Sequence, residues 1–117
     1  MRNKCQFHST NQQTTPFTST EEAWFWYCLC EQLEHSKIKT NSHHLIRPCE
    51  SSDIFLAVKK LMHAGILRPK HIKVLSKYGF EQIPPHPHFG DSLNICNIWQ
   101  EAIRFLDSLL RRKGIVV

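Results

Sequence analysis

Apolar residues recur at helical spacing in four stretches of the chain. The clearest stretch covers residues 92–113, where apolar and polar side chains occupy opposite sides of a wheel drawn at about 100° per residue. Shorter stretches of the same kind cover residues 20–35, 52–64 and 69–79. The pattern therefore predicts four helices, and the helix at 92–113 is expected to form the spine of the core.

Glycine and proline mark the ends of the two middle helices. Gly65 follows the second stretch at the position where a left-handed residue commonly ends a helix. Pro69 suits the first turn of the next helix, because its missing N–H would have no partner there in any case. Gly79 is expected to end that helix, and the prolines that follow it favour an extended connector.

The first 18 residues differ in composition from the rest of the chain. They are rich in Gln, Asn, Thr and Ser and carry few aliphatic side chains, so they cannot bury enough surface to offset the entropy of ordering. We therefore expect a disordered polar tail at 1–18 and one helical domain at 19–117. The predicted fold class is an all-α bundle of about four helices that contains a helix-turn-helix-like hairpin.

Positive charge is concentrated in the middle of the chain. The protein carries 15 Lys and Arg residues against 10 Asp and Glu residues, a formal net charge of +5. Residues 51–80 hold a large share of the cations and one acidic residue, Asp53. This distribution suits a polyanionic partner.

The hairpin at 52–79 gives this charge a DNA-binding interpretation, because recognition helices carry basic side chains for phosphate contacts. The expected contacts to double-stranded DNA come from Lys59, Lys60, Arg68, Lys70, Lys73 and Lys77. The exposed arc of the third helix has no Asn, Gln or Arg, the side chains that read base edges. Binding is therefore expected to depend on salt and to discriminate little between sequences, and the alternative is that the lysines are a solvated face.

A run of aromatic residues in the first helix supports a different class of function. Trp24, Phe25 and Trp26 are consecutive, so they spread around the helix and do not all face one core. Exposed aromatic side chains are typical of interface cores. The alternative function is a protein-interaction module or a homodimer, built on this helix and on the amphipathic helix at 92–113.

Catalytic, metal-binding and membrane functions find little support in the sequence. Eight histidines and five cysteines show none of the spacings typical of a structural zinc site. A phosphate-binding glycine loop and a recognisable nucleophile arrangement are also missing. We expect no enzyme activity, no metal and no cofactor. The lack of a long apolar run predicts a cytoplasmic protein with no membrane partner.

Three segments of the chain carry a resemblance to known sequences. They are "RPCESSDIFLAVKKLMHAGILRPKHIKVLSKYG", "PPHP" and "WQEAIRFLDSLLRRKGIVV". Across residues 20–117 the chain resembles a family of small helical proteins of alphaproteobacteria that has no established activity. The resemblance implies a bacterial cytoplasmic protein with a shared fold, and it assigns no catalytic residues.

Overall fold

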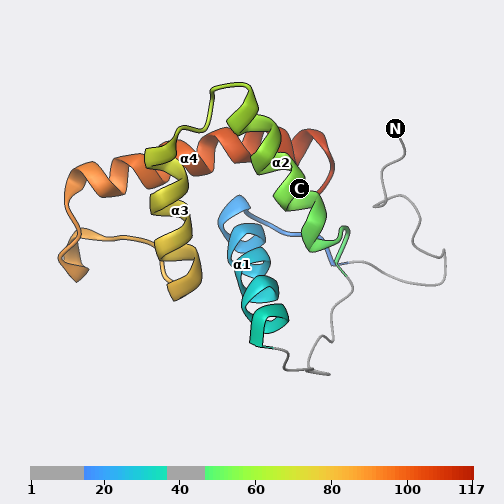
Figure 1. The fold of residues 1–117 in the computed structure, drawn as a ribbon, viewed down its shortest axis with the longest axis horizontal. Helices are drawn as coiled ribbons and strands as arrows, with labels where there is room; N and C mark the ends of the chain where they lie inside the picture. Colours follow the sequence, from blue (N-terminus) through green and yellow to red (C-terminus); the bar gives the residue numbers. More distant parts are fainter. Residues whose placement is uncertain (1–14, 37–46) are drawn as a thin grey trace.

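The computed structural model describes residues 15–36 and 47–117, which form four α-helices and one short 3-10 helix (Figure 1). The α-helices are α1 (Thr20–Ser36), α2 (Ser51–His63), α3 (Pro69–Glu81) and α4 (Leu93–Arg112), and the 3-10 helix is η2 (Pro87–Phe89). The predicted all-α bundle of about four helices is confirmed.

Helix α4 forms the spine of the bundle, as its apolar stripe predicts. It extends across the molecule in Figure 1 and packs against α1, α2 and α3. Ser92 is the N-cap residue of the helix, and its hydroxyl accepts a hydrogen bond from the N–H of Ile95 at 3.1 Å, which satisfies one free donor of the first turn. The side chains that it buries are Cys96, Trp99, Ala102, Leu106, Leu109 and Leu110.

The segment just before α1 belongs to the core, which corrects one prediction. Phe17 falls within the predicted polar tail, yet its side chain is 0% exposed. Its backbone oxygen accepts a hydrogen bond from the N–H of Val117 at 3.0 Å, and its ring packs on Trp26 with centroids 5.3 Å apart. The tail prediction is therefore wrong at Phe17, and its first 14 residues lie outside the described ranges.

Helices α2 and α3 form a hairpin that rests chiefly on α1 and α4. Gly65 has a φ of 77°, which confirms the expected left-handed position after α2. Leu67 in the turn is buried, whereas Ile66 is exposed. Pro69 begins α3, as predicted. The hairpin is thus fixed by the two outer helices and presents its remaining side to solvent.

Gly79 does not end α3, because the helix continues to Glu81 and then reaches Gln82 in the left-handed conformation, with a φ of 61°. The glycine is instead buried against α1. A Cβ atom at Gly79 would lie 2.5 Å from the Sγ of Cys28 and 2.6 Å from the Nε1 of Trp24. Its role is therefore close packing between α1 and α3, and the expectation of a helix stop was wrong.

Candidate nucleic-acid interface

All six predicted DNA-binding side chains are exposed. The row on α3, made of Lys70, Lys73 and Lys77, lies along the edge that faces α4. These lysines line a groove of about 260 Å³ together with Ile95 and Ile98 of α4. We call this the α3/α4 groove, and its lysines provide three cationic groups beside an apolar floor.

Within the described ranges, Lys70 and Lys73 make no ion pair, and Lys77 makes a weak one. The Nζ of Lys77 lies 3.8 Å from a carboxylate oxygen of Glu81, four residues later on the same helix. Both side chains are more than half exposed, and exposed pairs of this kind contribute at most about 1 kcal/mol. The same Nζ lies 4.5 Å from the centroid of the Tyr78 ring. The row therefore keeps its charge available to a polyanion.

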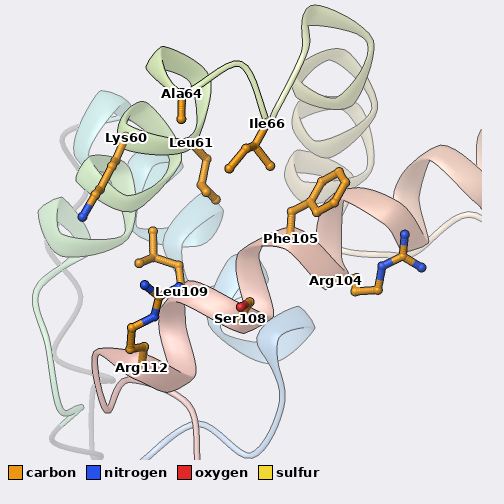
Figure 2. Close-up of a pocket in the computed structure, with 9 residues that line it drawn as sticks. All are labelled: Lys60, Leu61, Ala64, Ile66, Arg104, Phe105, Ser108, Leu109 and Arg112. Atoms are coloured by element: carbon orange, nitrogen blue, oxygen red, sulfur yellow. The ribbon is translucent and has the colours of Figure 1, made fainter.

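A second groove lies between α2, the turn after it and α4, and we call it the α2/α4 groove (Figure 2). It brings together Lys60 of α2 with Arg104 and Arg112 of α4. Neither arginine was among the DNA-binding residues predicted from the sequence. Their spacing of eight residues, with Ser108 midway, places all three on one stripe of α4. That stripe was the available signal, but the sequence did not show that α2 lies beside it.

Lys59 and Arg68 line neither of these two grooves. Lys59 precedes Lys60, so the two side chains leave α2 in directions about 100° apart. Arg68 comes directly before α3 at its N-cap position. The structure therefore gathers Lys60, Lys70, Lys73 and Lys77 along the edges of α4 and leaves the other two predicted residues at separate surface positions.

A buried histidine connects α3 to α4 between the two grooves. The Nδ1 of His71 accepts a hydrogen bond from the backbone N–H of Arg68 at 3.0 Å, which places the ring proton on Nε2. Nε2 donates to the Oε1 of Glu101 at 2.6 Å. This hydrogen bond lowers the pKa of Glu101, and the charges of Lys70 and Arg104 act in the same direction. His71 is 1% exposed, so its ring is not accessible to DNA and serves to join the two helices.

Tyr78 fixes the loop that leads into α4. Its hydroxyl donates to the Oδ1 of Asp91 at 2.6 Å, while the Oδ2 of Asp91 accepts from the N–H of His86 at 2.9 Å. The hydrogen bond to Asp91 raises the pKa of Tyr78 to about 12 and lowers the pKa of Asp91. The loop is thereby held against the end of α3 where Lys77 lies.

Alkaline pH is expected to destabilise the fold. Burial raises the pKa of Tyr27 and of Cys28 to about 12, in the same direction as Tyr78. A raised pKa in the folded state gives stability that is complete at neutral pH and is lost as pH rises from about 9 to about 12. Urea unfolding at several pH values should show this decline. Tyr78→Phe should flatten it, and an equal slope in wild type and variant would contradict the assignment.

The predicted aromatic interface is wrong for Trp24, which lies in the core. Its Nε1 donates to the backbone oxygen of Leu75 at 2.9 Å. Phe25 and Trp26 are half-buried, and both pack on the protein itself. Phe25 stacks on Trp99 with centroids 5.7 Å apart, and Trp26 contacts Phe17. The aromatic run of α1 therefore joins this helix to α4 and to the segment before α1.

Large exposed apolar side chains occur instead around a groove between α1, α2 and α3. Phe55 and Met62 of α2 and Phe80 of α3 are 49%, 45% and 46% exposed. They line a space of about 200 Å³ together with the half-buried Tyr27. Phe55 and Met62 lie on an edge of α2 that α1 and α3 do not cover.

Other kinds of site find no support within residues 15–36 and 47–117. These residues include no group of three or more His, Cys, Asp or Glu side chains that could hold a metal ion. None of the helices described there is both long and apolar enough to cross a bilayer. Two of the eight histidines, His43 and His44, lie outside these ranges.

Comparison of the chain with protein-family models, curated proteins and solved structures found no match. The resemblance to a family of small helical proteins therefore stays a prediction from the sequence. The two cationic grooves are the features of the described structure that bear most directly on function.

Proposed function

We propose that the protein is a non-enzymatic DNA-binding protein that contacts the phosphates of double-stranded DNA through α3 and the adjoining edge of α4. The observation that carries the proposal is the exposed lysine row of Lys70, Lys73 and Lys77. Among the described residues, Lys77 is the one member of this row that makes an ion pair, and that pair is exposed. Lys60 and Arg104 extend the positive charge along α4. Phosphates are the ligands that such a row of ammonium groups suits best.

The chemistry of the row sets the expected kind of binding. Lysine ammonium groups attract phosphates as point charges but do not read bases bidentately in the way of Arg or Asn. The lysines also lie beside apolar residues of α4, Ile95 and Ile98, which offer no hydrogen bond to a base. Affinity should therefore come largely from released counterions, with little preference for sequence.

Replacing the three lysines together is expected to remove most of the salt dependence of DNA binding. In fluorescence anisotropy with a labelled mixed-sequence duplex, three lost phosphate contacts should reduce the slope of log affinity against log salt by about 3. The variant is Lys70→Gln, Lys73→Gln, Lys77→Gln. Because all three side chains are exposed, circular dichroism should show an unchanged fold.

Single variants provide a matched control for position. Lys73→Gln and Lys59→Gln each remove one exposed lysine charge, but Lys73 lines the α3/α4 groove and Lys59 does not. Lys73→Gln should weaken binding more than Lys59→Gln at the same salt concentration. Equal loss in the two variants would mean that net charge and not the lysine row attracts DNA. Failure of the wild type to bind would overturn the proposed function.

A further inference from the structure

The α2/α4 groove has an apolar floor that phosphate binding does not use. Five apolar side chains converge on a space of about 350 Å³ between the two helices (Figure 2). They are Leu61, Ala64, Ile66, Phe105 and Leu109. The space falls within the range of roughly 300 to 1,000 Å³ that is typical of small-molecule sites. An apolar ligand group would be stabilised there by removal from water.

The cations of the groove are arranged unevenly around this floor. Figure 2 shows Lys60 and Arg112 on the same side of the groove, whereas the guanidinium of Arg104 points away from the groove. The Arg104 guanidinium carbon lies 5.7 Å from the ring centroid of Phe105. Two cations are thus available at one end of an apolar floor, and Ser108 adds a hydroxyl group to the lining.

The charged side chains that line the groove are all cationic. Its lining contains no carboxylate, and Lys60 and Arg112 make no ion pair with any described residue. A guanidinium binds a carboxylate through two parallel hydrogen bonds, and a nearby ammonium group strengthens the attraction. A ligand that combines an apolar body with one terminal carboxylate would therefore satisfy both parts of the groove.

We propose that the α2/α4 groove binds an alkyl carboxylate, with the chain on the apolar floor and the carboxylate between Lys60 and Arg112. The length of the groove favours an alkyl chain over a helical peptide. Residues 104 to 112 of α4 span about 12 Å, whereas an average helix of 11 to 12 residues is about 17 Å long. An acidic helix would extend beyond the groove, but a medium-length alkyl chain fits within it.

This ligand site does not depend on the proposed DNA binding. The lysine row of α3 lines a different groove, and neither Lys60 nor Arg112 belongs to that row. Either activity can be lost while the other remains. If the protein binds both ligands, a bound carboxylate would neutralise positive charge beside α4 and is expected to weaken DNA binding. Bound DNA would then weaken carboxylate binding by the same factor.

The test titrates the full chain with decanoate below its micelle concentration and follows the methyl groups by nuclear magnetic resonance. Saturable shifts are expected at methyl groups of Leu61, Ile66 and Leu109, which line this groove. The variant Lys60→Gln, Arg112→Gln should bind at least tenfold more weakly. Decyltrimethylammonium, with the same chain and the opposite charge, should also bind at least tenfold more weakly.

The control variant is Lys59→Gln, Lys73→Gln, which also removes two exposed cations but leaves the lining unchanged. It should bind decanoate within about twofold of wild type. Three results would overturn the proposal: no saturable binding by wild type, equal weakening in both double variants, or equal affinity for the cationic amphiphile. Shifts at the methyl groups of Met62 and Ile72 instead, which line the groove between α1, α2 and α3, would place binding in that groove and would also overturn the proposal.

Discussion

Gly79→Ala is expected to lower the free energy of unfolding by about 1 to 3 kcal/mol, the range for overpacking a well-filled core. The same change in an open helix usually stabilises, by about 0.4 to 1 kcal/mol, because alanine restricts the unfolded chain. At Gly79 the new methyl group would lie 2.5 Å from the Sγ of Cys28. It would also lie 2.6 Å from the Nε1 of Trp24, which is held by its bond to the Leu75 oxygen.

Urea unfolding followed by far-ultraviolet circular dichroism measures this effect. Ser76→Ala in the same helix is the control. Ser76 is half-buried, and an alanine side chain is smaller than the serine side chain it replaces, so no clash is introduced. Its effect should stay within about 0.5 kcal/mol. Cys28→Ala should relieve part of the clash, so the double variant should lose less stability than the sum of its singles. A Gly79→Ala protein as stable as wild type would refute the packing role.

His71→Ala is expected to cost about 3 kcal/mol, because it opens a cavity in the core and removes two hydrogen bonds. One bond caps the start of α3 through the Arg68 N–H, and the other attaches α3 to Glu101 of α4. The two bonds can be separated. His71→Asn places an oxygen near the position of Nδ1, whereas His71→Gln places an amide near the position of Nε2. Each should recover about 1 kcal/mol of the loss in urea unfolding.

The pH dependence of the same variants identifies the bond to Glu101. The pKa of Glu101 lies below its ordinary value of 4.5 in the folded protein. The contribution of this hydrogen bond to the free energy of unfolding is therefore complete above pH 4.5 and is lost as pH falls further. Wild type should therefore lose stability more steeply in acid than His71→Ala does. Identical acid slopes, or a cost for His71→Ala under about 1 kcal/mol, would show that the buried ring adds little.

The parts of the fold that depend on local pattern were predictable from sequence. The apolar stripe of α4 marked the spine because a buried helix face repeats at the helical period. Gly65 and Pro69 marked the hairpin turn because each has a conformational preference that acts within one or two residues. Neither inference required knowledge of which helices become neighbours.

Features that depend on distant neighbours were missed or misread. Phe17 sits in a polar stretch, yet its side chain is buried and its backbone pairs with Val116, a residue distant in the sequence. Gly79 looked like a helix stop because the sequence does not show that α1 approaches it closely. The same distinction holds for the candidate site. The lysine row was predictable from the helical period of α3, whereas the groove that contains Arg104 and Arg112 depends on α2 lying beside α4.

The contact between Phe17 and Val116 has a consequence for synthesis on the ribosome. Phe17 emerges early, but the residue that pairs with it emerges after all four helices. Closing so long a loop costs entropy before any contact offsets it. The ring of Phe17 can pack on Trp26 as soon as α1 forms, but its pairing with Val116 must wait until α4 and the residues after it leave the exit tunnel. During that interval the partly covered side chain is open to chaperones and to neighbouring chains.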